Sequence, residues 1–105
     1  MSSDVLVVLS TMPAAAAEQL AETLVGERLA ACVNLVGPVR SIYRWEGAIQ
    51  KDEEILAVIK TTAARYDALA ERLRAVHPYQ VPEIVALPVG AGHAPYLDWV
   101  RASLQ

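Results

Sequence analysis

The sequence predicts a single α+β domain over residues 1–105, with one β-sheet covered by helices. Three observations predict it. Short apolar runs typical of strands alternate with stretches of helical periodicity. Two of these runs follow each other across a turn signal, and no repeat or linker divides the chain. Finally, 105 residues suit one domain, and 54% hydrophobic residues are enough for one core.

The first elements are a strand and a helix. The run "DVLVVLST", residues 4–11, is almost continuously apolar, as in a central strand that is covered on its faces. Pro13 follows at a position that the first helical turn tolerates. Apolar residues then recur at helical spacing, and Gly26 predicts that the helix ends between 26 and 29. The residues of this stripe are Ala17, Leu20, Ala21, Leu24 and Val25.

Two long strands come next and predict a hairpin. They are "ACVNLVGPVRSIYRW", residues 31–45, and "AIQKDEEILAVIKTT", residues 48–62. Proline cannot donate to a sheet ladder, so Gly37-Pro38 indicates a bend or bulge within the first strand. Glu46-Gly47 between the strands is a turn signal.

The last elements are a helix, a strand and a helix. Thr62 is a candidate N-cap, and Pro78 cannot continue the helix that follows it. "EIVALPV", residues 83–89, predicts a short strand, and Pro95 opens a final helix. The order βαββαβα is that of a ferredoxin-like split β-α-β sandwich with an added C-terminal helix. The apolar stripes of these two helices are Tyr66, Leu69, Leu73 and Val76, and Leu97, Val100 and Leu104.

The predicted hairpin is too long for its own domain. Each arm spans about 45 Å at about 3.3 Å per residue, whereas a chain of this size has a radius of gyration of about 13 Å. An overhanging two-stranded ribbon is marginally stable in water, and its edges favour pairing. We therefore expect another copy of the chain to complete it. Trp45 beside the turn is a candidate interface anchor, unless it folds back on its own sheet.

Composition and charge exclude several classes of function. The net charge is −3, and the two lysines and seven arginines are scattered, which argues against nucleic-acid binding. "VLVVL" is too short for a signal peptide or a membrane span, so the expectation is a cytoplasmic protein that does not interact with membranes. The single cysteine, Cys32, cannot form an internal disulfide.

The histidines and the cysteine are the first candidates for chemistry. His77 is a candidate metal ligand, or else a residue that caps the last carbonyls of its helix. Cys32 at a strand start predicts core packing. His93 lies in "GAGHAP", which is no phosphate-binding motif, and its spacing from His77 matches no standard metal site.

The charged residues of the strands are the other candidates. The run from Asp52 to Glu54 predicts a solvated face near the hairpin tip. Lys60 and Glu83 both adjoin apolar strands, and buried charges are usually paired, so they are a candidate ion pair. No Ser/His/Asp or Cys/His constellation is present by spacing, so the expectation is a protein that is not an enzyme.

Five blocks in order resemble the CutA divalent-cation tolerance family. They are "LAACVN", "SIYRWEG", "DEEILAVIKTT", "HPYQVPEIVALPV" and "YLDWV", within residues 5–103. The resemblance implies a ferredoxin-like subunit in a homotrimer with the architecture of the PII signalling proteins, whose ligands lie between subunits. It implies that Tyr79 and Glu83 line an intersubunit cleft. Trp45, as the candidate interface anchor, and Lys60 are the further candidates for this cleft or interface.

The resemblance also implies a site for copper(II) or another divalent cation. In the family this site is attributed to a first-strand cysteine and to a histidine pair before "PY". Here Ser10 and Val76 occupy two of these positions, and only His77 matches. Three copies of His77 around a trimer axis could still form a cluster, because copper(II) favours imidazole and sulfur ligands.

Three functions remain open. The first is a non-enzymatic homotrimer that binds metal ions or a small effector in metal-ion homeostasis. The second is a PII-like sensor of a small anionic ligand, which requires Lys60, Arg40 and Arg44 to converge on a cleft. The third is a structural trimeric scaffold. An RNA-binding sheet is disfavoured, because the strands lack the aromatic and basic pattern that stacks bases.

Overall fold

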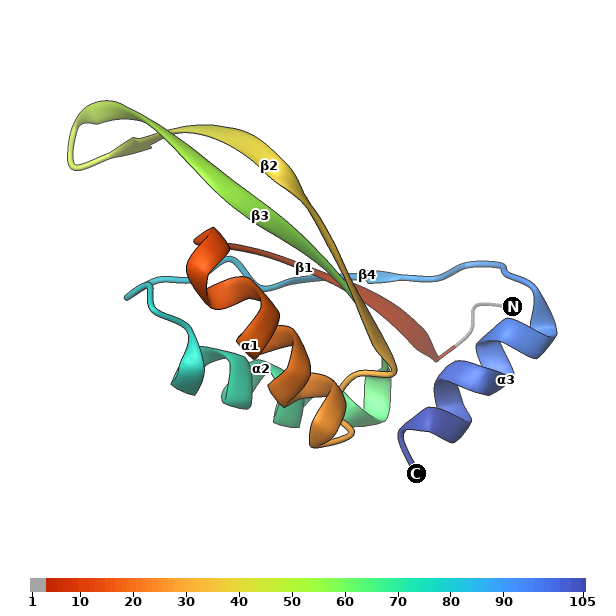
Figure 1. Ribbon diagram of the computed structural model, residues 1–105. Coiled ribbons are helices and arrows are strands. Elements are labelled where there is room, and N and C mark those ends of the chain that lie inside the picture. Colours follow the sequence, from red (N-terminus) through yellow and green to blue (C-terminus); the bar gives the residue numbers. More distant parts are fainter. Residues whose placement is uncertain (1–3) are drawn as a thin grey trace.

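The computed structural model describes residues 4–105 and has the predicted order of elements (Figure 1). Four strands and three helices follow one another with short connections. Their bounds are β1 Val5–Met12, α1 Ala14–Gly26, β2 Cys32–Trp45, β3 Ala48–Thr62, α2 Ala63–Val76, β4 Val85–Pro88 and α3 Ala94–Ser103.

The four strands form one antiparallel sheet in the order β2-β3-β1-β4. This is the ferredoxin-like arrangement that the sequence predicts. β4 is shorter than predicted, because residues 83 and 84 precede it without joining the ladder. Pro78 and Pro82 lack the N–H that pairing requires, and the chain between α2 and β4 is irregular.

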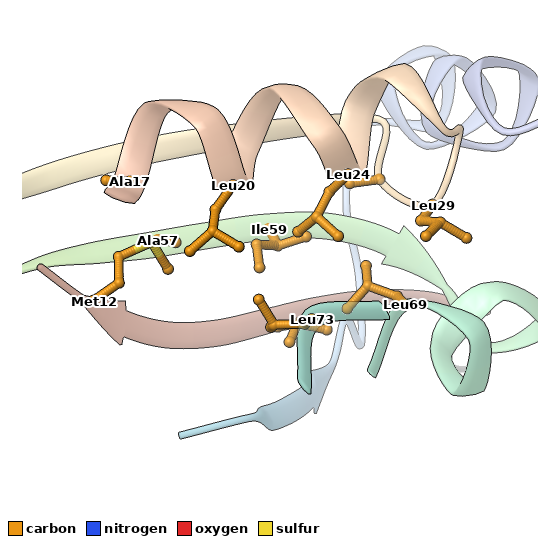
Figure 2. Close-up of a cluster of buried hydrophobic side chains, with 11 residues drawn as sticks. Met12, Ala17, Leu20, Leu24, Leu29, Ala57, Ile59, Leu69 and Leu73 are labelled. Carbon is orange, nitrogen blue, oxygen red and sulfur yellow. The ribbon is translucent and has the colours of Figure 1, made fainter. Parts of the chain in front are cut away.

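The main core lies between one face of the sheet and the helices α1 and α2. Val8 and Ile59 of the sheet are fully buried in this core. Figure 2 shows Ile59 between leucines of both helices. Branched and unbranched aliphatic side chains fill this layer, as expected of a chain without phenylalanine. The buried members that Figure 2 labels are Met12, Ala17, Leu20, Leu24, Leu29, Ala57, Ile59, Leu69 and Leu73.

Among residues 4–105, helices cover the opposite face of the sheet only at one end. There α3 packs Val100 and Leu104 against Val5. Strand side chains alternate between faces, so the register places a second set of apolar residues on this side. We call them the open face; they are Val7, Leu9, Val36, Leu56, Val58, Val85 and Leu87. Three of them, Val36, Val85 and Leu87, are about half exposed.

The hairpin of β2 and β3 extends beyond the rest of the domain, as predicted (Figure 1). Pairing of β3 with β1 stops at Ile55, so residues 48–54 pair with β2 alone. The bend at Gly37-Pro38 is confirmed by a shift of register between Val36 and Val39. At the tip, Glu46 and Gly47 have φ angles of 50° and 78°, which suits a tight two-residue turn. The domain measures 44 × 27 × 22 Å as a result.

Candidate functional site

A cleft of about 740 Å³ lies where the hairpin leaves the sheet. One wall is the hairpin, which contributes Tyr43, Trp45 and Glu54. The other wall is the segment between α2 and β4, which contributes Tyr79 and Glu83. Three of the four predicted cleft residues therefore line one cleft, whereas Lys60 lies elsewhere.

Strand alternation explains why these hairpin residues face the cleft. β2 residues 39, 41, 43 and 45 pair with β3 residues 54, 52, 50 and 48 and point to the same side. On β3 this side is continuous with the open face, because Leu56 and Val58 share it. The hairpin thus extends the uncovered side of the sheet and replaces its aliphatic residues with aromatic and acidic ones.

Glu54 and Tyr79 meet inside the cleft. The Tyr79 hydroxyl donates a hydrogen bond of 2.7 Å to Glu54 Oε2. Burial, and secondly this contact with the carboxylate, raises the pKa of the Tyr79 phenol far above its usual value, so it stays protonated. Glu54 is only 6% exposed, so the prediction of a solvated acidic face is wrong for this residue.

A second phenol and carboxylate pair lies closer to the hairpin tip. The Tyr43 hydroxyl donates to the exposed carboxylate of Asp52. That hydrogen bond is the main reason why the pKa of the Tyr43 phenol is raised. Both phenols therefore remain neutral donors.

His77 lies behind this cleft and uses both ring nitrogens. The backbone N–H of Tyr79 donates to His77 Nδ1 at 3.0 Å, which requires an unprotonated Nδ1. His77 Nε2 lies 2.9 Å from the carbonyl oxygen of Thr11, which can only accept, so Nε2 carries the proton and donates it. The ring is 7% exposed and fixes the chain reversal after α2. In this arrangement it has no free lone pair for a metal ion.

The other positions implied for copper do not complete a site in one subunit. Ser10 is fully buried on the helix-covered face, and its hydroxyl has no hydrogen-bond partner within residues 4–105. Val76 has no metal-binding atom. In the same range, no three His, Cys, Asp or Glu residues are grouped closely enough to hold a metal ion. The residues of one chain therefore do not fit a copper centre.

Lys60 belongs to a different cluster, at the α3 end of the sheet. Its ammonium donates to Asn34 and lies 3.9 Å from Cys32 Sγ. It forms no ion pair with Glu83, so the predicted pair of Lys60 and Glu83 is wrong. Cys32 is partly buried and lies 3.7 Å from the hydroxyl of Tyr96 rather than within the core. This hydrogen bond raises the pKa of Tyr96. The pairing of Cys32 with Lys60 in the hairpin register would have revealed the cluster.

The remaining sequence candidates do not contribute to the cleft. His93 is exposed at the start of α3, and its side chain does not cap the helix. Arg40 and Arg44 are exposed on the other side of the hairpin, opposite Glu53 and Ile49 of β3. The cations that an anionic ligand would require therefore do not converge on the cleft of a single subunit.

Comparison with known proteins agrees on one family. A family model described as CutA1 divalent ion tolerance protein matches residues 5–103. The chain is 53% identical over 96 residues to the divalent-cation tolerance protein CutA of Thermus thermophilus, which covers 90% of this chain and 93% of that protein. It is 51% identical over 85 residues to the human protein CutA, covering 81% of this chain and 48% of the human protein, so it spans about half of that relative.

Solved structures give the same result. The crystal structure of CutA from Xylella fastidiosa superposes with a TM-score of 0.95 at 42% identity, over 98% of this chain and 100% of that one. The Thermus thermophilus protein superposes with a TM-score of 0.92 at 50% identity, over 96% and 99% of the two chains.

Proposed function

Because the chain belongs to the CutA1 divalent ion tolerance family, we propose that it contributes to divalent-cation tolerance as a non-enzymatic homotrimer. Each subunit binds a small effector in the cleft beneath its hairpin. Neighbouring copies cover the open face and the hairpin, as in the PII-like architecture that the resemblance implies.

The open face is the observation that carries the assembly. A sheet with helices on one side needs a second layer on the other, and here α3 covers only one end. The remaining apolar side chains are spread over all four strands, and three of them are about half exposed. Contiguous apolar surface of this kind marks an interaction site. Contact with identical chains in a closed ring hides all such faces at once.

We propose binding as the role of the cleft. Among residues 4–105, its lining contains no histidine or cysteine that could act as a base or nucleophile beside an activating group. It contains aromatic rings, backbone and two carboxylates, which is the composition of a small-molecule site. Tolerance would then depend on an effector bound by the trimer.

Copper binding at His77 is untested, and the contacts of the ring within one chain argue against it. It requires the ring to leave its hydrogen bonds to Thr11 and Tyr79 and to meet its counterparts from two further subunits. Within one chain the ring bonds the Thr11 carbonyl of β1 and the Tyr79 amide, so its contacts are structural but are not the expected cap on the last carbonyls of its helix.

The cellular location also stays a prediction, and we propose the cytoplasm. No helix within residues 4–105 has the length and apolar character needed to cross a membrane. Relatives are described differently from one another: the CutA structure from Archaeoglobus fulgidus is called periplasmic, and the rice protein CutA 1 is called chloroplastic.

Native mass spectrometry with and without copper(II) tests the proposal, with His77→Ala as the comparison. We expect three chains per particle in every sample and no stoichiometric copper. One copper per chain or per trimer in the wild type that is lost in His77→Ala would contradict the effector reading and establish a metal site. A single chain per particle would contradict the trimer.

A further inference from the structure

Glu54 is a mostly buried acidic residue that has no cationic partner among residues 4–105. Its side chain is 6% exposed, yet within residues 4–105 it forms no ion pair. Its one hydrogen bond comes from the neutral phenol of Tyr79 and uses Oε2. Buried carboxylates are normally paired with a cation, because a desolvated charge without a counter-charge is costly. Glu54 also lines the cleft, so a cation can reach it from there.

The rest of the cleft suits an organic cation rather than a bare ion. Tyr43, Trp45 and Tyr79 are partly exposed, and all three line the cleft. Aromatic faces attract ammonium and guanidinium groups and also pack against alkyl chains. Glu83 adds a second carboxylate, and no lysine or arginine is among the lining residues. The volume of about 740 Å³ lies within the usual range for small-ligand sites.

We propose that the cleft binds an organic cation, either an alkyl guanidinium or a primary ammonium. Its charged group pairs with the free oxygen of Glu54, and its alkyl portion lies against Trp45 and the two tyrosine rings. The inference rests on the cleft of the proposed function and names the chemistry of its ligand. It replaces the anionic ligand with a cationic one.

The same chemistry has a second source within an assembly. Arg40 and Arg44 are exposed on the far side of the hairpin and form no ion pair within residues 4–105. An arginine from a second copy could therefore enter the cleft in place of a free ligand. The two sources differ in one testable respect, because only the arginine blocks the cleft against an added probe.

Fluorescence titration with butylguanidinium tests the proposal, and neutral butylurea of similar shape is the control ligand. A Trp99→Phe background leaves Trp45 as the reporter inside the cleft. Glu54→Gln keeps the shape of the side chain and the contact with Tyr79 but removes the charge. Glu53→Gln is the matched control, because this neighbour loses the same charge from the other face of β3. Circular dichroism confirms that each variant is folded.

We expect butylguanidinium to bind the Trp99→Phe protein and its Glu53→Gln derivative equally, and Glu54→Gln at least about tenfold more weakly. Butylurea should not bind. Equal binding by Glu54→Gln, or equal binding of butylurea, would overturn the proposal.

If the probe does not bind, the double variant Arg40→Gln, Arg44→Gln decides the matter. Binding to this variant that depends on Glu54 would identify the cation as an arginine of a second copy. No binding to either protein would overturn the inference. The native mass of the same samples keeps this result separate from the proposed function: a trimer without probe binding refutes the cationic ligand alone, and a monomer that binds the probe refutes the trimer alone.

Discussion

Replacing Ser10 with alanine should stabilise the protein. The hydroxyl is fully buried in β1 and has no hydrogen-bond partner within residues 4–105. Burial of an unpaired hydroxyl costs about 1–3 kcal/mol in protein mutational data. Removing one oxygen leaves a void of roughly 10 Å³, which costs about 0.2 kcal/mol at 24 cal/mol per Å³. The free energy of unfolding should therefore rise by about 1 kcal/mol.

Thr61 supplies the opposite case in the neighbouring strand. It is equally buried, but its hydroxyl donates 2.7 Å to the carbonyl oxygen of Leu29. Thr61→Val keeps the shape and removes this donor, which leaves the carbonyl unpaired and should cost about 1–3 kcal/mol. The two variants remove the same group and should change stability in opposite directions.

Guanidinium unfolding at one fixed chain concentration measures both effects, because an oligomer's apparent stability depends on concentration. We expect the midpoint to rise for Ser10→Ala and to fall for Thr61→Val. Loss of about 1 kcal/mol or more in Ser10→Ala would refute the reasoning, since it would show that the hydroxyl has a partner in solution.

Three further outcomes are expected. His77→Ala loses both ring hydrogen bonds and should lower the free energy of unfolding by about 1–3 kcal/mol in metal-free buffer; an unchanged value would contradict a structural role for these two bonds. The raised pKa of Tyr79 means that its proton is held more tightly in the folded state, so its contribution to stability is present below pH 10 and is lost as the pH rises above it. Ultraviolet titration should show that Tyr79→Phe removes the phenol that ionises last. The Arg101 guanidinium lowers the pKa of Asp4, so this ion pair contributes to the free energy of unfolding above the usual carboxyl pKa and loses that contribution as the pH falls. Carbon-13 NMR should show a higher Asp4 pKa in Arg101→Gln. An unchanged Asp4 pKa would contradict the pair.

Local signals account for most of the fold. The period of the apolar residues determines whether each segment forms a strand or a helix. Gly37-Pro38 and Glu46-Gly47 mark the bulge and the turn because their backbone requirements are local. The positions of this bulge and this turn in the sequence determine the length of the hairpin. β4 was overestimated, because an apolar run does not show how many of its residues find a partner strand.

The site was only partly predictable. Trp45, Tyr79 and Glu83 were placed at an intersubunit cleft or interface; they line one cleft of the single chain, and its border with a second subunit stays a prediction. Glu54 was missed because it sits in an acidic run that reads as solvated, whereas its burial depends on a tyrosine 25 positions away. The role of His77 depends on a carbonyl of β1, which no spacing in the sequence reveals.

The partner of Lys60 could have been found from strand register. Once the turn at Glu46-Gly47 is accepted, counting back along both arms, with one shift at the bulge, places Cys32 opposite Lys60. Glu83 was assigned to Lys60 only because both adjoin apolar strands. Pairing of charges between distant segments is determined by tertiary packing, which the local pattern does not contain.

The mass of the particle in solution tests the central claim most directly. Sedimentation equilibrium of the wild-type chain should give three chains. In a second variant, residues 41–52 are replaced by Asn-Gly, so that Arg40 and Glu53 close a short hairpin. At the same concentration this variant should give fewer chains per particle than the wild type. A wild-type particle of one chain would contradict the account, because the open face and the hairpin would then have no partner.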